Sequence, residues 1–319
     1  MWSQTLTNPG RRLQQAPGGA ARQRRRRRAA PLVGRFRYGY VSPAVLLVAV
    51  LLYLPFLWTV YQSFTSYSGL GPMTWTGLAN YRTLLHDPYL LSAIRNTLLW
   101  VAGTLVLPVA LGLLVAVLSY NLPHGGWYRL PFLLPYAMSG TGVAVAWGII
   151  LEHGGIANNL LSAIGLPGGG ESFLLYAPQN SIAMIIASTW QQLGVNALLF
   201  VVGLQSIPRE PIEAARLDGA SGWTLFRRII WPLLAPLTTV VVGLALVASL
   251  KTFDIVWVMT QGGPGRSSET LAITMYKDTF VADQYGYGSA VAIFLTVVTG
   301  IVSWLYLRRQ LSSRRAIGA

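Results

Sequence analysis

The sequence predicts an all-α, polytopic membrane protein with six transmembrane helices. Hydrophobic residues make up 53% of its 319 positions and charged residues only 11%, whereas roughly 25% of an average soluble chain is charged. Several apolar stretches are long enough to cross the roughly 30 Å hydrocarbon layer of a bilayer, which takes about 20 helical residues. The basic residues are unevenly distributed along the chain, as the positive-inside rule requires of a membrane protein with a fixed orientation.

Six apolar stretches meet the length criterion for a transmembrane helix. They cover residues 42–64, 94–119, 130–151, 180–204, 233–258 and 287–307. The third contains Pro131 and Pro135, and we interpret it as one span. The connecting segments are too short to form a further domain with its own core.

The N-terminal segment is strongly basic, with ten of the 24 basic residues in the first 37 positions. The apolar stretch that follows begins near Val41 and is too long for the apolar region of a cleaved signal peptide. We therefore expect residues 1–40 to be a disordered cytoplasmic tail. Its position beside an apolar chain favours attachment to anionic lipid over binding to nucleic acid. Residues 41–309 then form the transmembrane domain, and residues 310–319 form a short C-terminal tail.

The orientation follows from the positions of lysine and arginine. With the N-terminus in the cytoplasm, nineteen of the 24 basic residues lie on the cytoplasmic side. The other five lie outside or in the outer half of a helix, and they are Arg82, Arg95, Lys251, Arg266 and Lys277. This split predicts a multi-pass protein of the plasma or inner membrane with both termini in the cytoplasm.

The sequence contains little that indicates an enzyme active site. The chain has no cysteine, which excludes thiolate catalysis and cysteine-ligated metals. It also lacks a G-x-x-x-x-G-K-[ST] phosphate loop and an H-E-x-x-H motif. Its three histidines, His86, His124 and His153, fall in loops on different sides of the membrane. We expect no catalytic residue and no metal site in this chain.

The longest cytoplasmic loop, residues 205–231, carries the signals of a short helix. Pro211 suits the first helical position, and Glu213 lies near the helix N-terminus, where the dipole favours negative charge. Asp218 and Gly219 suit the end of the helix, since glycine readily adopts the left-handed conformation. Ser221 is placed to cap a second short helix.

Two interpretations of this short helix remain open. Ala214 and Ala215 permit close approach of another protein, and Glu213 offers a carboxylate to a basic partner. The alternative is an ordinary amphipathic helix that only connects two spans.

Several motifs along the chain resemble those of a known family. Glu213-Ala214-Ala215, with Gly219 and Pro232 following, resembles the EAA loop of ABC importer permeases. The other motifs resemble the first-type permease of sugar and glycerol-phosphate importers, and they are Gly77-Leu78-Ala79-Asn80-Tyr81, Asp87, Asn96-Thr97, Phe253-Asp254, Thr260-Gln261-Gly262-Gly263-Pro264, Tyr276 and Phe280. The resemblance covers residues 42–309.

The resemblance implies a type I ABC importer permease fold and an assembly. A second permease subunit, two ATPase subunits and an extracellular solute-binding protein would be the partners, and ATP and magnesium would bind to the ATPase rather than to this chain. Glu213, Ala214, Ala215, Asp218 and Gly219 would couple the permease to the ATPase, with Glu213 in contact and Gly219 at the bend. The chain lacks the large extracellular insert of some maltose-type permeases.

Polar residues within the fourth span are candidates for a substrate path. A polar side chain at the bilayer midplane needs a partner that lipid does not supply. Gln192 and Asn196 are four residues apart and share one helix face, and Trp190 adds an aromatic surface on which a sugar could stack. The alternative is hydrogen bonding between helices.

Three further candidates lie in the third and fifth spans. Lys251 and Asp254 form an i,i+3 pair in the outer half of the fifth span, where a structural salt bridge would lower the cost of insertion. Contact with substrate is the alternative for both residues. Trp147 in the third span is either a packing residue or part of the path.

The function favoured by these observations is the permease subunit of an ATP-driven importer of mono- or oligosaccharides. A glycerol 3-phosphate importer is an alternative, although a phosphate usually binds arginine or helix N-termini, and no arginine lies deep in a span. An ion-coupled secondary transporter usually has acids or histidines along an intramembrane relay, and here every acid except Asp254 lies in a loop or at a helix end. A membrane scaffold or receptor subunit would not account for the docking loop.

Overall fold

The structure is a computed structural model that describes residues 33–120, 122–166, 170 and 172–317. Within these residues the chain is helical, and its extended structure is limited to one isolated antiparallel bridge between Thr65 and Trp75. The all-α prediction is therefore confirmed. Residues 1–32, with the arginine run at 24–28 on which the tail prediction rests, lie outside the described residues, whereas residues 33–40, which we assigned to the disordered tail, belong to helix α1.

The chain divides into two units, residues 1–55 and 56–319. In the first unit, helix α1 (Val33–Val48) continues through a π-helical turn, η2 (Ala49–Tyr53), into the start of α2 (Leu54–Gln62). Residues Val41–Gln62 form one apolar helical span of 22 residues. The predicted first span, residues 42–64, is thus helical except for its last two residues.

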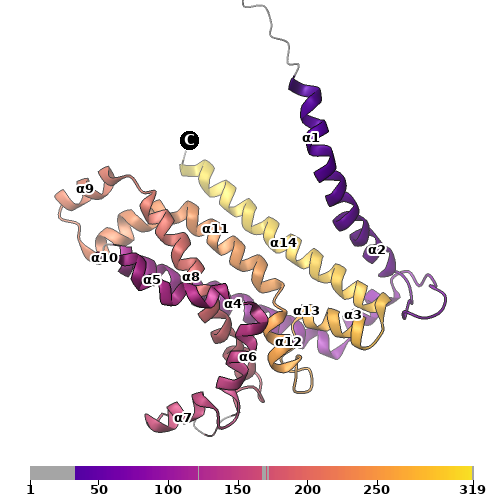
Figure 1. Ribbon diagram of the computed structural model, residues 1–319. Helices are drawn as coiled ribbons and strands as arrows, with labels where there is room; N and C mark the ends of the chain where they lie inside the picture. The colour runs from indigo at the N-terminus through magenta and orange to yellow at the C-terminus, as the bar shows by residue number, and fades with distance from the viewer. Residues whose placement is uncertain (1–32, 121, 167–169, 171, 318–319) are drawn as a thin grey trace, which may run out of the picture. The chain divides into compact units, whose positions relative to one another are not determined.

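The second unit holds the other spans (Figure 1). Its long helices are α4 (Pro88–Tyr120), α8 (Gln179–Gln205), α11 (Trp231–Leu250) and α14 (Tyr285–Ile317). Shorter helices outside the breaks described below are α3 (Ala79–His86), α7 (Ile156–Ala163), α9 (Arg209–Leu217), α10 (Gly222–Leu225) with η4 (Phe226–Ile230), and α13 (Leu271–Tyr276) with η5 (Lys277–Val281). Over the described residues, five helices are long and apolar enough to cross a membrane, and a bent pair raises the number to six.

The third span is not the single helix that we predicted. It consists of α5 (Gly125–Leu133), the 3₁₀ turn η3 (Leu134–Ala137) and α6 (Gly140–Leu151), and its two parts are bent by 99°. Pro135 lies in the 3₁₀ turn, where its missing N–H ends the α-helical ladder. Ser139 has an extended backbone and accepts a hydrogen bond from the N–H of Gly142 at 3.0 Å, so it caps a new helix.

The fifth span is broken as well. Helix α11 ends at Leu250, and α12 (Asp254–Thr260) begins four residues later. Lys251 therefore lies in the non-helical segment 251–253 and Asp254 begins the next helix, so the two residues do not have i,i+3 helical geometry. No ion pair joins them among the described residues, so the predicted salt bridge is wrong.

Helix α8 is the centre of the second unit. Its residues Phe200, Val201 and Leu204 pack with Val109 and Ala116 of α4 and with Leu234, Val241 and Ala245 of α11. A second cluster joins α4, α6, α8, α12 and α13, and it contains Trp100, Val143, Ala144, Met184, Ile185, Ile255, Val256 and Ile273. Glycine allows the close approach of α4 to α8, because a Cβ at Gly112 would lie 2.6 Å from Cβ of Asn196. Small residues at helix contacts are typical of membrane proteins.

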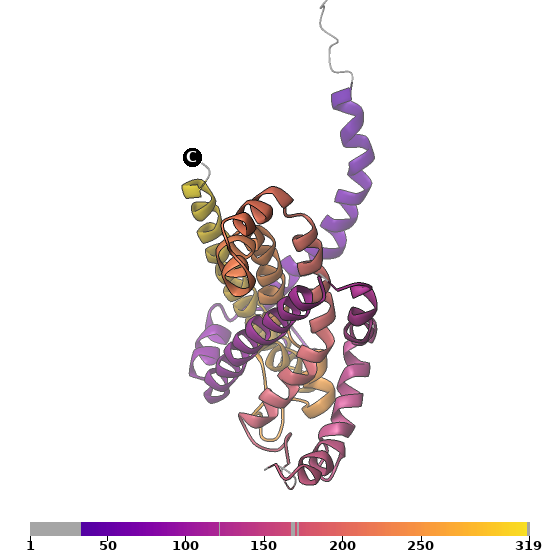
Figure 2. The same cartoon turned by 90° about the vertical axis from the view of Figure 1, so that its left-hand side faces the viewer.

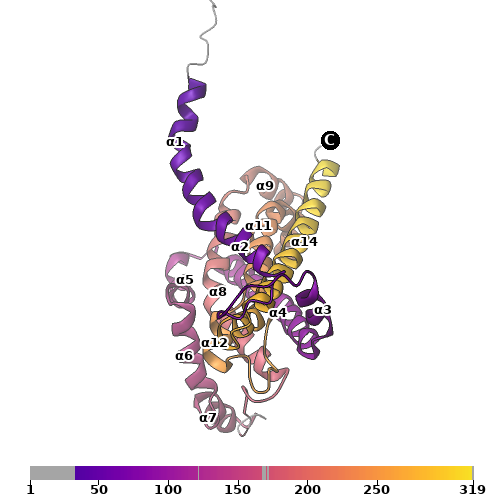
Figure 3. The same cartoon turned by 90° about the vertical axis from the view of Figure 1, so that its right-hand side faces the viewer.

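The two ends of the second unit differ in what they carry. Helix α9 and the C-terminal end of α14 lie at one end, and α7 lies at the other, as the views in Figures 2 and 3 agree. This arrangement places the basic loop and the basic end of α14 together, which the predicted topology requires.

Candidate functional site

The loop between α8 and α11 contains the predicted short helix, α9. The helix begins at Arg209, two residues before the predicted start, with Pro208 as its N-cap. Pro211 still lies in the first turn, where its missing N–H costs no helical hydrogen bond. Glu213 and Ala214 are exposed, whereas Ala215 is buried within the chain. Only one of the two alanines is therefore available to a partner.

The end of α9 is fixed by its glycine. Gly219 has a φ of +85°, and its N–H donates to the carbonyl of Arg216 at 3.1 Å. The N–H of Ala220 donates to the carbonyl of Ala215 at 2.8 Å. These two bonds form a Schellman motif, in which glycine avoids the strain of the left-handed conformation. The prediction that the helix ends at Asp218 and Gly219 is confirmed.

The segment after α9 differs from the prediction in one detail. Ser221 occupies the N-cap position of α10, but its side chain makes no capping hydrogen bond. The aromatic rings of Trp223 and Phe226 stack with their centroids 5.4 Å apart. Trp223 remains 71% exposed and Leu217 90% exposed. This end of the molecule thus presents apolar side chains beside the Glu213 carboxylate.

The breaks in the third and fifth spans lie side by side. A Cβ at Gly140, the first residue of α6, would lie 2.9 Å from Oδ2 of Asp254, the first residue of α12. Around this contact is a small cavity of about 210 Å³, which we call the membrane groove. It is lined by Gly140, Ser188, Gln191, Gln192, Ala248, Lys251, Thr252, Phe253, Asp254 and Ile255. Irregular backbone at membrane depth is tolerated where it is buried in protein or lines a wet cavity.

Three of the predicted path residues line the membrane groove, namely Gln192, Lys251 and Asp254. Gln192 lies at the middle of α8 and donates to the hydroxyl of Ser188 at 2.7 Å. Its neighbour Gln191 donates to the carbonyl of Met138, in the break before α6, at 3.0 Å. Lys251 and Asp254 are both exposed. The groove therefore combines amide, hydroxyl, ammonium and carboxylate groups in one place.

The other three predicted path residues lie elsewhere. Asn196 is buried against Gly112 of α4 and does not line the groove. Trp147 and Trp190 pack edge to face with their centroids 6.1 Å apart, and Trp147 also packs against the second core cluster. The shared helix face of Gln192 and Asn196 thus runs from the groove into the contact between α8 and α4.

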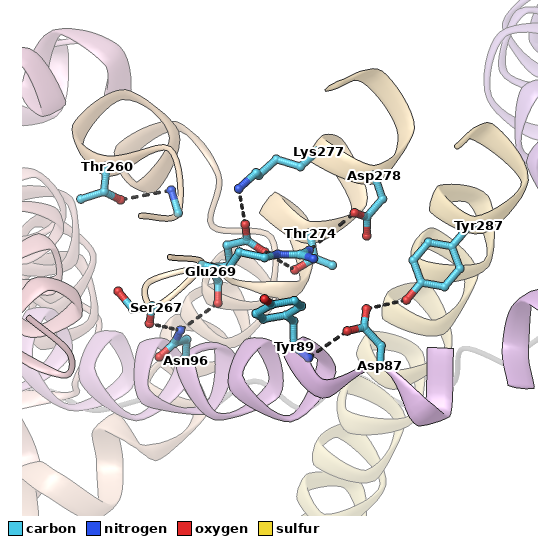
Figure 4. Close-up of polar contacts among 12 residues, drawn as sticks. Asp87, Tyr89, Asn96, Thr260, Ser267, Glu269, Thr274, Lys277, Asp278 and Tyr287 are labelled. Atoms are coloured by element: carbon cyan, nitrogen blue, oxygen red, sulfur yellow. Dashed lines mark hydrogen bonds and ion pairs between the residues drawn. The ribbon is translucent and has the colours of Figure 1, made fainter. Parts of the chain in front are cut away.

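Sequence reasoning missed a cluster of charged residues around the loop before α13 and η5, which Figure 4 shows. We call Arg266, Glu269, Lys277 and Asp278 the ion cluster. Glu269 is 1% exposed and accepts hydrogen bonds from Nε of Arg266 at 2.6 Å, from Nζ of Lys277 and from Oγ1 of Thr274 at 3.2 Å. The signal in the sequence was two acids and two bases within thirteen residues, but their spacing did not show which would pair.

Asp278 has fewer cationic and hydrogen-bond partners than Glu269. Its nearest cation is Nη2 of Arg266, 3.5 Å from Oδ1, while Lys277 contacts Glu269 instead. Burial raises the pKa of Asp278 to about 6, with Arg266 opposing the shift and Glu269 adding to it. The pKa of Arg266 is raised because the hydrogen bond and charge of Glu269, with Asp278 and Asp87, outweigh the opposing effect of burial.

Several of the motif residues noted in the sequence hold the segment that carries the ion cluster in place. Nδ2 of Asn96 donates to the carbonyls of Ser267 and Glu269 at 2.7 and 2.9 Å. Oγ1 of Thr97 accepts from the N–H of Leu271 at 3.1 Å. These bonds tie the segment before α13 to α4. Gly262 has a φ of +79° and no room for a Cβ because the side chain of Glu269 covers it.

Comparisons with known proteins agree with this arrangement. A model of the family described as "binding-protein-dependent transport system inner membrane component" matches residues 45–315. A probable ABC transporter permease protein of Pyrococcus horikoshii is 35% identical over 271 residues, which cover 84% of this chain and 93% of that protein. The multiple sugar-binding transport system permease protein MsmF of Streptococcus mutans is 33% identical, with 83% and 91% covered.

Two further comparisons bear on substrate and fold. The sn-glycerol-3-phosphate transport system permease protein UgpA of Agrobacterium fabrum is 31% identical, with 82% of this chain and 89% of that protein covered. A chain in the crystal structure of a bacterial alginate ABC transporter, in complex with an alginate pentasaccharide-bound periplasmic protein, aligns with a TM-score of 0.75 at 22% identity. The alignment covers 85% of this chain and 92% of that one, and at this identity it shows the fold alone.

Proposed function

Because the chain belongs to the family of inner membrane components of binding-protein-dependent transport systems, we propose that it forms half of the translocation pore of an ATP-driven sugar importer. The family makes it a multi-pass permease subunit of the inner membrane. The proposal adds the path through the chain, the coupling surface and the substrate class.

The observation that carries the proposal is the meeting of two broken spans at the membrane groove. Breaks at 138–139 and 251–253 interrupt two of the predicted spans, and a break within a span needs hydrogen-bond partners that lipid does not supply. Discontinuous helices at the midplane are a common feature of transporter binding sites. Gln192, Lys251 and Asp254 are then the residues of this chain that meet the substrate.

The coupling surface that we propose is the exposed side of α9. Glu213 and Ala214 are free to contact an ATPase, and the apolar side chain of Leu217 is 90% exposed one turn further on. An exposed apolar side chain beside a carboxylate suits a protein interface better than free solvent. This assignment places α9 and both chain termini in the cytoplasm, and it assigns ATP and magnesium to two ATPase partners.

Two further partners belong to the proposal. The second permease subunit would complete the pore, because the membrane groove is an open surface and not an enclosed channel. An extracellular solute-binding protein would deliver the sugar, since the family to which the chain belongs serves binding-protein-dependent transport systems.

A glycerol 3-phosphate importer is a second candidate on one observation. Lys251 is an exposed cation in the membrane groove, and no carboxylate lies within ion-pair distance of it among the described residues. It could bind a phosphate as a point charge. An uptake assay with the assembled transporter, using a panel of neutral sugars beside glycerol 3-phosphate, separates the two candidates.

The path assignment is tested by cysteine labelling in this cysteine-free chain. Gln192→Cys should react with a small hydrophilic thiol reagent, and its rate should change when nucleotide is added to the complex. Asn196→Cys is the matched control on the same helix, and burial against Gly112 should keep it inert. Equal reactivity at both positions, or none at 192 in any state, would refute the path.

The coupling assignment is tested by charge reversal on α9. Glu213→Lys should reduce uptake and copurification of the ATPase while membrane insertion stays normal. Glu210→Lys is the control, since it makes the same change on the same helix one turn earlier. Full uptake in Glu213→Lys would show that this helix only connects two spans.

A further inference from the structure

A second cavity lies beside the ion cluster. Its volume is about 880 Å³, within the range of small-molecule sites, roughly 300–1,000 Å³. Helix α3, the start of α4, the loop before α13, η5 and the start of α14 all contribute to its walls. The cavity shares no lining residue with the membrane groove.

Two residues that line this cavity, Arg266 and Asp278, hold a buried donor and a buried acceptor without hydrogen-bond partners just beneath its surface. Nη2 of Arg266 and Oδ2 of Asp278 are both buried, and neither has a hydrogen-bond partner. Arg266 uses its Nε on Glu269, and its Nη2 is an ion-pair neighbour of Asp278 without a hydrogen bond. Buried polar groups without partners are few in native proteins, and each needs an explanation.

The neighbouring carboxylate in the same cavity, Asp87, has a hydrogen-bond donor at each of its two oxygens. Asp87 accepts a hydrogen bond from the hydroxyl of Tyr287 at 2.7 Å and another from the N–H of Tyr89 at 2.8 Å. A tyrosine hydroxyl thus satisfies one of its oxygens. Asp278, which is 9% exposed, lacks such a donor at Oδ2.

We propose that this cavity binds a neutral polyhydroxylated molecule, a sugar or polyol, through Arg266 and Asp278. One hydroxyl carries a donor and two acceptor lone pairs, so it can accept from Nη2 of Arg266 and donate to Oδ2 of Asp278 once a small turn of these side chains opens the two atoms, which are closed to solvent here, toward the cavity. An anionic ligand would meet the Asp278 carboxylate, and a cationic ligand would meet the Arg266 guanidinium. Neutral hydroxyl groups satisfy both atoms without a charge conflict.

The walls fit the same ligand class. His86 and Gln284 offer further hydrogen-bonding groups around the cavity. Tyr89 is 45% exposed, and the centroid of its ring lies 4.5 Å from Cζ of Arg266. The site lies outside the proposed transmembrane path, so this inference goes beyond the transport function and does not depend on it.

Binding should depend on pH through Asp278. Its carboxylate is a stronger acceptor than the neutral acid, and its pKa is raised to about 6. Affinity should therefore fall as the pH is lowered through 6. The charged and titratable groups that face Asp278 are Arg266 and Glu269 from the loop, Lys277 beside it, Asp87 before α4, Arg82 and His86 on α3, and Tyr287 on α14.

The test uses the full chain in lipid nanodiscs, without ATPase or nucleotide. Binding of glucose, trehalose, sucrose and glycerol is measured by saturation-transfer NMR at pH 7.5 and pH 5. We expect at least one of these probes to bind at pH 7.5 and to bind several-fold more weakly at pH 5. Asp278→Asn should weaken binding by about tenfold or more, the scale of a lost hydrogen bond to a charged group.

Matched variants keep the proposal falsifiable. Asp283→Asn makes the same change five residues away, at an exposed position outside the cavity, and should leave binding unchanged. Thr83→Trp should block the cavity from its exposed rim without touching the ion cluster. Gln192→Leu alters the membrane groove, which is lined by other residues; any part of the signal that it removes belongs to that groove, and the part that Thr83→Trp removes belongs to this cavity.

Three results would overturn the proposal. The first is the absence of binding by every probe to the unaltered chain, and the second is equal affinity in Asp278→Asn and Asp283→Asn. The third is loss of binding in Gln192→Leu with retention in Thr83→Trp, which would assign the signal to the membrane groove. If no probe binds but a solute-binding protein protects residues 82–89 and 278–287 from hydrogen exchange, the cavity is a protein contact and the sugar assignment is wrong.

Discussion

Replacing Glu269 with Gln should destabilise the protein strongly, although the change alters only one atom of the side chain. Glu269 is the shared counter-ion of Arg266 and Lys277, and its side chain is 2% exposed. The glutamine can still accept one hydrogen bond, but it carries no charge to balance two cations. Removing one partner of a buried ion pair costs about 3–5 kcal/mol.

The expected magnitude is smaller than that range, because the side chains of Arg266 and Lys277 remain 23% and 28% exposed. Water at these exposed atoms should reduce the loss to about 2–3 kcal/mol. At about 2–4 °C per kcal/mol for a chain of this order of size, the melting temperature should fall by roughly 5–10 °C.

The assay is thermal unfolding of the purified protein in detergent, followed by intrinsic tryptophan fluorescence. Glu152→Gln is the matched control, since Glu152 is exposed and belongs to none of the ion pairs of the described residues. Lys277→Met should partly rescue Glu269→Gln, because it removes one of the two unbalanced cations. A melting temperature for Glu269→Gln equal to that of Glu152→Gln would refute the reasoning.

Three further predictions follow from other parts of the chain. The pKa of Asp278 is about 6 in the folded chain against 3.8 for the free group, so the folded chain binds this proton more tightly than the unfolded chain. Lowering the pH from 7.5 to 5 should therefore add about 1 kcal/mol to the free energy of unfolding through this group. Melting curves of Asp278→Asn at the two pH values should lack that increment. Gly219→Ala should lower the stability of this helix end by about 1 kcal/mol, because alanine is strained at a φ of +85° even though no atom lies within 4 Å of its Cβ. Uptake should fall while membrane insertion stays normal, and unchanged uptake would contradict a role for the helix end in coupling. Deleting residues 1–30 should leave uptake nearly intact, since the remaining basic residues already favour the same orientation; loss of transport in a correctly inserted deletion variant would show that the tail does more than bind lipid.

The positions of the spans could be predicted from the sequence because they depend on composition. A helix must be about 20 residues long to cross a bilayer, and the apolar stretches show where such helices lie. The breaks within the spans could not be predicted in the same way. Pro131 lies inside α5 without ending it, whereas Pro135 lies in the turn that does end it.

The break in the fifth span has no proline at all. Residues 251–253 leave the helix beside the membrane groove, where the side chains of Lys251 and Asp254 are exposed. The charge of these two residues was the available signal, and we interpreted it as a salt bridge within one helix. Polar residues within a predicted span indicated an irregularity there, but whether it was a salt bridge within one helix or a break in the helix depended on the packing of α6 against α12.

The ion cluster could not be predicted from the sequence for a different reason. Glu269 meets Arg266 and Lys277 because the chain reverses at Gln261–Gly265 and is then tied to α4 by Asn96. That turn requires the left-handed glycine at 262, against which Glu269 packs. Pairings of this kind are set by tertiary contacts, which residue spacing does not encode.

The two polar sites of the molecule share one short element, α12. Its first residue, Asp254, packs against Gly140 at the membrane groove, and its last, Thr260, shares a hydrogen bond of 2.9 Å with Ser268 beside the ion cluster. Oγ1 of Thr270 also donates to the carbonyl of Thr252 at 3.1 Å, which links the cluster directly to the break before α12. Widening the groove by moving α12 therefore has to break the bonds that join Thr260 and Thr252 to the segment before α13, or carry along the loop that holds Glu269, which Asn96 ties to α4.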